Sequence, residues 1–571
     1  MQFAKTPWTD LVGDKPLQEY PRPQFQRDSY VNLNGWWQYA ITNSAITPPQ
    51  FDGQILVPFS PESMLSGVNR QLKPNQYLHY RTTFTLPKAF NKGTVLLHFG
   101  AVDNVCSVFV NGLKVGSHQG GYDAFSLDIT LFLQDKENVL DVVVCDSTEK
   151  GICATGKQRL KKGKIWYTAQ SGIWQTVWLE SVPAQRINNV KIVPNIDNGT
   201  VTLYLDKQQV DSVTAAVYDN GVELCKVDSA SDVITLQMPQ DFVLWTPECP
   251  KLYDLVLISR RDKVKSYFAM RKVALKRDYF GYYRTMLNNK PYFINGVLDQ
   301  GYWSDGLYTA PTEQAIAFDI ASAKSLGFNA LRKHVKVEPM RWYYNCDKLG
   351  MLVWQDMPSG GKINCFTSKI APWLCVKKLK DTKYRRFVRS NAKSRKQFSN
   401  EYFSMLNQLY NAPCIFAWNV FNEGWGQFDS KQFVQQTKKL DSSRLVSGAS
   451  GWHSQGGDDF SSQHVYFRKL KLKRDSKRAV VLGEFGGYGY KQGKGRYFCY
   501  KKFSNPTDFS NGLANLYANQ VAPLVKRGLT ACFYTQLSDV ENETNGLVSF
   551  DRQTIKVDAD SLKQIVTKVK M

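Results

Sequence analysis

The chain of 571 residues lacks the features that define several classes of protein. No stretch approaches the roughly 18–20 consecutive apolar residues of a membrane-spanning helix, and the start has no apolar core of signal-peptide length. The 11 cysteines are odd in number and are never spaced as CxxC, which argues against a zinc cluster or a disulfide framework. We therefore expect scattered buried thiols, a cytoplasmic location and no membrane partner.

The chain also has few acidic residues relative to its basic ones. The 73 Lys and Arg residues outnumber the 50 Asp and Glu residues, so that the net charge is +23. Three segments carry most of the excess: residues 377–396 hold +9, residues 468–478 hold +6 and residues 491–502 hold +5. Such a charge favours an anionic partner. No OB-like or RRM-like module interleaves aromatic residues with these cations, so we expect no nucleic-acid partner.

The first half of the chain has the pattern of β-structure. In residues 1–183, short runs rich in β-branched and aromatic residues alternate with turn signals such as Asn111-Gly112, which predicts a two-sheet sandwich. Residues 184–276 repeat this pattern on a smaller scale, with five to seven strands in the size of an immunoglobulin-like domain. The expected strands of the two regions are Val95–Phe99, Ser107–Val110, Val139–Cys145, Gln175–Leu179, Asn188–Val193, Val201–Leu205, Val213–Tyr218, Val233–Met238 and Tyr253–Ser259.

From residue 277 to residue 571, strand-like runs alternate with helical segments. Eight strands in this length predict a (β/α)8 barrel with intervening helices. An open doubly wound sheet is the alternative, but no GxGxxG motif or P-loop follows a strand. The predicted strands are Tyr292–Leu298, Ala330–His334, Leu352–Met357, Ile415–Asn422, Leu445–Ala449, Gln463–Tyr466, Val480–Phe485 and Leu529–Leu537.

Two carboxylates follow barrel strands at the end where such barrels carry their active sites. Glu423 follows the fourth predicted strand and Glu484 ends the seventh, and glycines follow both. Strands four and seven face each other, which allows the roughly 5–5.5 Å carboxyl separation of a retaining glycosidase. Burial beside tryptophan would suit one glutamate to donate a proton, while the other stays ionised and attacks carbon. Position alone also allows two unrelated glutamates in loop salt bridges.

The motifs around these glutamates resemble those of glycoside hydrolase family 2, the β-galactosidase, β-glucuronidase and β-mannosidase group. Asn422-Glu423-Gly424-Trp425 resembles the acid/base signature, and Gly483-Glu484-Phe485-Gly486-Gly487 resembles the nucleophile signature. Three further motifs extend the resemblance over nearly the whole chain. Asn34-Gly35-Trp36-Trp37, Tyr80-Arg81-Thr82-Thr83-Phe84 and Ser171-Gly172-Ile173-Trp174 are similar to the family's sugar-binding jelly-roll.

The resemblance implies roles for individual residues. Glu423 would protonate the glycosidic oxygen and later activate water, while Glu484 would form the glycosyl-enzyme ester. Asn422 would bond the sugar 2-hydroxyl, and Tyr466 is similar to the family tyrosine that tunes the nucleophile. The other residues expected to bind substrate are Asp299, Trp303, Arg332, His334, Trp425, Trp452 and Gln536.

Departures from the family pattern restrict the choice of sugar. The first barrel strand lacks the usual histidine in Gly296–Trp303, and strand eight lacks a tryptophan-rich run. The segment Asn545-Gly546-Leu547 lacks the lysine with which glucuronidases grip the uronate, although a lysine from another loop could substitute. We expect a retaining, exo-acting β-glycosidase, with β-galactosidase as the first specificity. The alternatives are a β-mannosidase-, arabinosidase- or β-glucuronidase-like activity and an inactive saccharide-binding protein.

The basic segments suggest a further property of this enzyme. They follow predicted strands three, six and seven, so they start from the catalytic face, where they could steer anionic saccharides towards the pocket. Solvated loops that carry charge for solubility are the alternative. No His, Asp or Cys set has metal-ligand spacing, so we expect no metal and no other cofactor, with the Mg²⁺ that some relatives in the family bind as the alternative. Since the jelly-roll of the family often contributes to a subunit interface, a homo-oligomer is also an expectation.

Overall fold

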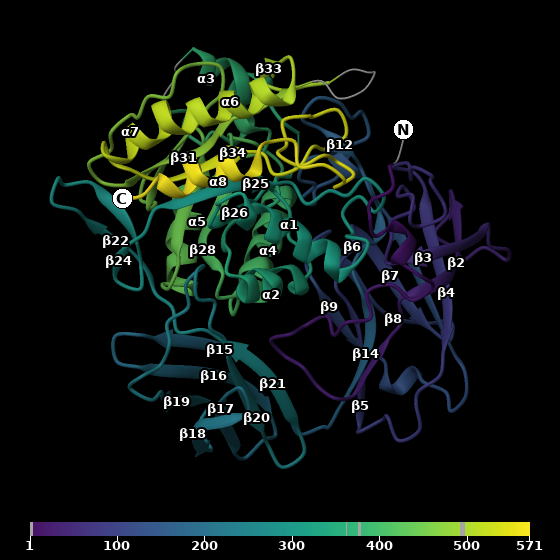
Figure 1. The fold of residues 1–571 in the computed structure, drawn as a ribbon. Coiled ribbons are helices and arrows are strands. Elements are labelled where there is room, and N and C mark those ends of the chain that lie inside the picture. Colours follow the sequence, from purple (N-terminus) through teal and green to yellow (C-terminus); the bar gives the residue numbers. More distant parts are fainter. Residues whose placement is uncertain (1–3, 361, 375–377, 491–496) are drawn as a thin grey trace.

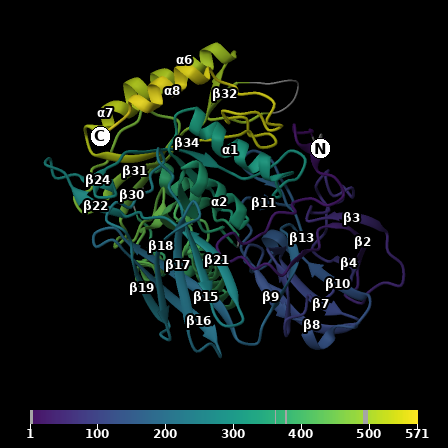
Figure 2. The ribbon, with the colours of Figure 1, turned by 60° about the horizontal axis from the view of Figure 1, so that its bottom comes forward.

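The computed structural model describes residues 4–360, 362–374, 378–490 and 497–571. Its three parts follow one another along the chain (Figure 1): a β-sandwich in purple and blue at the right, a smaller sandwich at the bottom, and a barrel in teal to yellow at the upper left. Figure 2, turned by 60°, shows the two sandwiches side by side below the barrel. The predicted fold class, two sandwiches followed by a (β/α)8 barrel, is confirmed.

The first sandwich packs a four-stranded sheet against a six-stranded sheet. Alternate side chains point into a shared core, as in the strand Val105–Val110, whose even positions are buried. The predicted turn at Asn111-Gly112 joins two strands, and both residues have positive φ, at 52° and 80°. The sheets are β1 (Tyr30–Asn32), β14 (Val177–Val182), β5 (Thr94–Phe99) and β9 (Phe125–Asp128), and β3 (Gly53–Val57), β2 (Gly35–Thr42), β4 (Tyr77–Phe84), β10 (Asn138–Cys145), β7 (Val105–Val110) and β8 (Leu113–Gln119).

The second sandwich has seven strands, the upper end of the predicted number. A three-stranded sheet faces a four-stranded sheet across a core of Val, Leu and Ile side chains. The strands are β15 (Arg186–Asn195), β16 (Thr200–Gln208) and β19 (Val233–Gln237), and β18 (Val222–Ser229), β17 (Val213–Asp219), β20 (Tyr253–Ile258) and β21 (Lys263–Phe268). The early segment around Arg27 also contacts this sandwich, because the guanidinium of Arg27 pairs with Asp262 at 2.8 Å.

A small sheet of β22 (Val273–Arg277), β23 (Tyr283–Leu287) and β24 (Lys290–Pro291) leads into the barrel. All eight predicted barrel strands are present and parallel, in the order β29-β28-β27-β26-β25-β34-β31-β30. β29 and β30 are neighbours without a hydrogen-bonded ladder, so the barrel is nearly closed. The strands are β25 (Ile294–Asp299), β26 (Ala330–Lys333), β27 (Leu352–Asp356), β28 (Ile415–Asn422), β29 (Leu445–Ser450), β30 (Phe460–Val465), β31 (Ala479–Gly486) and β34 (Leu529–Thr535).

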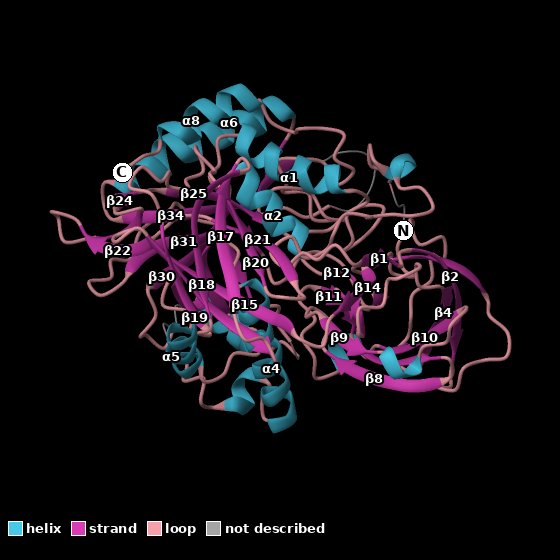
Figure 3. Ribbon diagram, turned by 90° about the horizontal axis from the view of Figure 1, so that it is seen from below, coloured by secondary structure: helices cyan, strands magenta, loops and turns pink. Residues whose placement is uncertain are grey.

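Helices cover the outside of the barrel, as Figure 3 shows for the layer of α6 and α8 over the strands. The predicted helix between the first two strands is α1 (Glu313–Ser325), and Thr312 caps it by accepting from the backbone N–H of Ala315. The others are α2 (Met340–Leu349), α3 (Ala371–Trp373), α4 (Ala392–Leu409), α5 (Ser430–Leu440), α6 (Pro506–Leu516), α7 (Ala522–Val525) and α8 (Ala559–Lys568). Loops replace helices after β29 and β30, where residues 451–459 and 466–478 lack an apolar stripe of helical period.

The cysteines partly match the expectation of scattered buried thiols. The ten described cysteines are all free, and six of them are buried, but Cys249 and Cys365 are exposed. No helix within the described ranges is long and apolar enough to cross a membrane. Of the basic segments, residue 377 and residues 491–496 lie outside the described residues. In the segment after β30, Arg478 is not free, because it pairs with Asp458 and Asp475.

Candidate active site

The two glutamates predicted from sequence lie at the carboxyl ends of barrel strands. Glu484 lies near the carboxyl end of β31, and Glu423 directly follows β28. The backbone turns sharply at Glu423, where φ is 50°, and Gly424 follows with φ of 70°. The carbonyl oxygen of Ser450 on β29 accepts from the Glu423 N–H, which fixes this turn. Both side chains therefore project into the mouth of the barrel.

The carboxylates of Glu423 and Glu484 lie close together. One oxygen of each, together with the Nδ1 atom of His464, falls within a mutual distance of 4.8 Å. Retaining glycosidases hold their carboxyl groups about 5–5.5 Å apart, whereas inverting enzymes need about 6.5–9.5 Å. In the described part of the chain this is also the only set of His, Cys, Asp and Glu ligand atoms close enough for a metal ion. Arg332, 3.2 Å from Glu484, already supplies positive charge there.

Glu484 is held in its ionised form. Its Oε2 atom accepts from the Tyr466 hydroxyl, and its Oε1 atom accepts from Arg332 Nη1 at 3.2 Å. Burial by itself would raise the pKa of Glu484. The neighbouring His464 and Arg332 outweigh burial and lower that pKa to about 2. An ionised, hydrogen-bonded carboxylate can attack an electrophilic carbon at neutral pH.

Glu423 has the opposite tendency. Burial and the adjacent charge of Glu484 raise its pKa, and the hydrogen bond from His464 only partly opposes them. The side chain of Glu423 keeps 15% of its surface exposed, against 7% for Glu484. Two neighbouring carboxylates with opposed pKa shifts are the arrangement in which one acts as acid and the other as nucleophile.

His464 lies between the two glutamates and was not predicted from the sequence. It stands on β30, and its Nδ1 atom is 2.8 Å from Glu423 Oε1 and 3.5 Å from Glu484 Oε1. Its Nε2 atom is 2.8 Å from the Ser450 hydroxyl, and its side chain is completely buried. Since a carboxylate only accepts, Nδ1 carries the proton when Glu423 is ionised. His464 therefore links the two carboxylates directly.

Arg332 and Asn422, both predicted, form the floor beside the nucleophile. Arg332 donates to the Gly483 carbonyl at 2.8 Å and to Asn422 Oδ1 at 2.8 Å. Because arginine only donates, this contact orients the amide oxygen of Asn422 towards Arg332. The Nδ2 group of Asn422 is buried and has no partner within the described structure. It is thus free to donate to a sugar hydroxyl.

Asp356 orients Arg332 and His334 by hydrogen bonds and was likewise not predicted. It ends β27, is fully buried, and accepts from Arg332 Nη2 at 2.9 Å and from Asn419 Nδ2 at 2.9 Å. His334 shares the carboxylate, with Nδ1 at 2.9 Å. Burial lowers the pKa of His334 to about 4, so the ring is neutral at pH 7 and donates from Nδ1. Its Nε2 atom is then left as an acceptor.

Aromatic side chains surround the glutamates. Trp425 packs against His334, with ring centroids 6.2 Å apart, and against Trp166 of the first sandwich, at 5.1 Å. Trp452 donates to the Glu423 carbonyl oxygen at 2.9 Å. Tyr466 stacks on Tyr500 at 3.8 Å between centroids. Flat faces of this kind suit the C–H groups of a sugar ring.

Three predicted substrate-binding residues contact other side chains instead of the glutamates. Asp299 is buried and pairs with Lys333 at 2.6 Å. Trp303 packs against Trp8 and lies under the guanidinium of Arg552. Gln536 accepts from Gln300 Nε2 at 2.6 Å, while its own Nε2 group has no partner in the ranges described. None of these contacts joins the three residues to the glutamates, so their role in binding stays a prediction.

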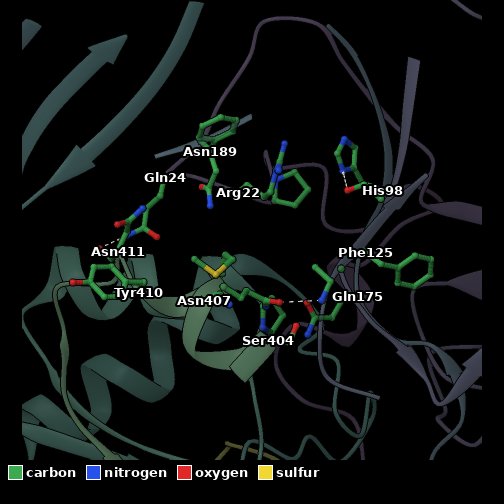
Figure 4. Close-up of a pocket in the computed structure, with 18 of the residues that line it drawn as sticks. Arg22, Gln24, His98, Phe125, Gln175, Asn189, Ser404, Asn407, Tyr410 and Asn411 are labelled. Carbon is green, nitrogen blue, oxygen red and sulfur yellow. Dashed lines mark hydrogen bonds between the residues drawn. The ribbon is translucent and has the colours of Figure 1, made fainter. Parts of the chain in front are cut away.

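A cavity lies away from the glutamates, between the domains (Figure 4). Its volume is about 660 Å³, and it is lined by His98 and Gln175 of the first sandwich, Asn189 of the second, and Asn407 and Tyr410 near the end of α4. Neither glutamate lines it. The cavity is larger than a water site, but no Asp or Glu is among the residues that line it.

Two family models match the chain. The "Glycosyl hydrolases family 2, sugar binding domain" covers residues 61–183, and the "Glycosyl hydrolases family 2, TIM barrel domain" covers residues 282–477. Together they cover more than half of the sequence. A β-galactosidase of Thermoanaerobacter pseudethanolicus is 25% identical over 439 residues, which are 72% of this chain and 54% of the relative. The chain spans about half the length of the curated relatives it matches.

Solved structures share the whole fold. A β-glucuronidase from Ruminococcus gnavus has a TM-score of 0.75 at 16% identity and covers 97% of this chain and 100% of its own. A β-galacturonidase from Eisenbergiella tayi, bound to galacturonate, has a TM-score of 0.73 at 16% identity, with coverage of 96% and 99%. These likenesses show that the three-part architecture is common to such chains.

Proposed function

The chain belongs to family 2 of the glycosyl hydrolases, and from this we propose that it is a retaining, exo-acting β-glycosidase. One observation carries the proposal: carboxylates at the ends of β28 and β31 lie within 4.8 Å and have opposed pKa shifts. That spacing suits a covalent intermediate, because it leaves no room for a water molecule between the nucleophile and the sugar.

The proposed reaction has two displacements. Ionised Glu484 attacks the anomeric carbon while protonated Glu423 gives its proton to the glycosidic oxygen, so the aglycone leaves and an ester to Glu484 forms. Glu423, now ionised, then takes a proton from water, and the resulting hydroxide attacks the same carbon and releases Glu484. The free Nδ2 group of Asn422 is placed to donate to the 2-hydroxyl, where a hydrogen bond strengthens as the transition state develops.

We infer a β-galactosidase-like specificity first, supported by the β-galactosidase relatives. A uronide-specific enzyme is the second candidate, since the structural neighbours include β-glucuronidases and a β-galacturonidase. An inactive saccharide-binding protein is disfavoured because both acids, with their tuning partners, are in place.

Retention of configuration is the expected result that tests the reaction type. The wild-type protein should release a product with the β configuration first, which then mutarotates. Proton NMR of the anomeric signals during hydrolysis of a panel of aryl β-glycosides would detect it. An α product released first would mean that water attacks directly, and it would contradict the two-step reaction.

Replacement of His464 by asparagine should move the acidic limb of the pH–rate profile. His464 is the strongest of the groups that lower the pKa of Glu484, ahead of Arg332, His334 and Tyr466. Without it that pKa rises, so Glu484 becomes protonated at a higher pH on acidification and activity is lost earlier. The measurement is kcat/KM from pH 3 to pH 9. An unchanged acidic limb would show that His464 does not tune the nucleophile.

A further inference from the structure

Buried lysine side chains are usually paired with carboxylates. Four lysines of the described chain are buried: Lys157, Lys333, Lys336 and Lys556. Three of them follow the rule. Lys333 pairs with Asp299 and Glu338, Lys336 pairs with Glu338, and Lys556 pairs with Asp539.

Lys157 is the exception. It is only 6% exposed, yet among the described residues no carboxylate lies within 4.0 Å of its ammonium group and no acceptor lies within hydrogen-bonding distance. Its contacts are with two aromatic rings, Tyr167 at 5.5 Å and Trp425 at 6.0 Å from the ring centroids. Cation–π contacts of this length are weaker than an ion pair, so the ammonium group remains available to an anion.

The position of Lys157 connects it to the candidate active site. It precedes β11 (Gln158–Arg159) of the first sandwich, and the backbone N–H groups of Thr155 and Gly156 donate to Ser359, in the loop after β27 of the barrel. This segment of the sandwich is therefore fixed at the mouth of the barrel. Trp425, the ring beneath Lys157, lies two residues after Glu423.

The charge of Lys157 influences two groups of the candidate active site, Glu423 and His334. Burial is the main cause of the raised pKa of Glu423 and of the lowered pKa of His334. The positive charge of Lys157 lowers the pKa of both groups. Arg159 adds a second cation next to it, with its guanidinium 4.3 Å from the centroid of Trp166, the ring that packs on Trp425. Within the described ranges, Arg159 also has no carboxylate within 4.0 Å.

From these contacts we propose that Lys157 recognises an anionic substituent, a carboxylate or a sulfate ester, on the saccharide bound at Glu423 and Glu484. The inference rests on the proposed glycosidase function and narrows its substrate class. The anion of the substrate supplies the partner that the protein does not, and Arg159 adds favourable long-range charge. The segment Asn545-Gly546-Leu547 does not fulfil this task, since it offers no lysine and its Gly546 N–H is bonded to Asp539.

The test compares matched substrates. Initial rates would be measured with 4-nitrophenyl β-galactoside, β-galacturonide and 6-sulfo-β-galactoside, and with the corresponding glucose series. Because a hydrogen bond to a charged group contributes about 1.5–3 kcal/mol, Lys157→Met should lower kcat/KM for the preferred anionic substrate roughly 10- to 100-fold more than for the neutral substrate. Comparison of the carboxylate and sulfate substrates identifies which anion is recognised.

Lys161 offers a matched control, because it lies on the same loop and is exposed. Lys161→Met should leave both rates unchanged. An equal effect of Lys157→Met on charged and neutral substrates, or no effect on either, would overturn the inference while the glycosidase proposal stands. If the wild type cleaves no glycoside, the glycosidase proposal fails. Tryptophan fluorescence then decides about Lys157: galacturonate or glucuronate should bind more tightly than galactose or glucose, and a lack of this preference overturns it.

Discussion

Replacement of Glu484 by alanine is expected to lower kcat/KM for aryl β-glycosides by about 10⁴-fold or more. No other group can form the ester, because Glu423 has a raised pKa and is bonded to His464. Water would have to attack the anomeric carbon without an activating base on that face. The rate of nitrophenolate release measures the loss, and Glu137→Ala, a change at an exposed glutamate, serves as the control for the substitution itself.

Added azide gives this experiment a second readout. Alanine leaves space beside Arg332 and Tyr466, the two groups that hold the Glu484 carboxylate. A small anion can occupy it and attack the sugar from the nucleophile's face, which produces an α-glycosyl azide from a β-glycoside. Recovery of the rate together with that product would identify Glu484 as the nucleophile. Hydrolysis that survives the substitution undiminished would contradict the assignment.

The architecture could be predicted because local pattern and fold agree in this chain. Strands such as β27, β28 and β34 are apolar runs that are buried along their whole length, and parallel strands buried on both faces must have that composition. The barrel then determines which residues meet: β28 and β31 bring Glu423 and Glu484 together although 61 positions separate their numbers. Loops rather than helices follow β29 and β30, because the segments after these strands have no apolar stripe of helical period.

The residues that the sequence did not reveal depend on long-range contacts. His464 follows no motif and stands two positions before the predicted Tyr466, and both side chains reach Glu484. That spacing was a usable signal. Asp356 was visible as an acid at the end of a predicted strand. Lys157 carried no signal at all, because its environment arises from a sandwich segment that docks on the barrel.

The geometry of neighbouring strands determines which partner a strand-end side chain meets. Asp299 ends β25, and the neighbouring strand β26 places Lys333 beside it, so that the two form a buried ion pair at 2.6 Å. A shift of one residue along a strand turns a side chain from one face of the sheet to the other. Arg332, one position before Lys333, thus faces the glutamates, while Lys333 faces away.

Replacement of Glu423 by glutamine should have an effect that depends on the leaving group. A phenyl or alkyl aglycone needs the proton that Glu423 donates, so kcat/KM for such β-glycosides should fall about 10²- to 10⁴-fold. A dinitrophenyl aglycone leaves without a proton, so its first displacement should remain fast. The ester on Glu484 should then accumulate, because no base activates water, and a burst of dinitrophenolate followed by a slow steady state would reveal it.

The pH profile and azide separate this variant from Glu484→Ala. In the wild type, activity requires Glu423 to be protonated, so it is lost as the pH rises through the raised pKa of Glu423. With glutamine at position 423 that alkaline limb should disappear. Azide should attack the accumulated ester on the face that Glu423 lines and give a β-glycosyl azide, the opposite anomer to that from Glu484→Ala. The same anomer from both variants would show that the two glutamates do not act on opposite faces of the sugar.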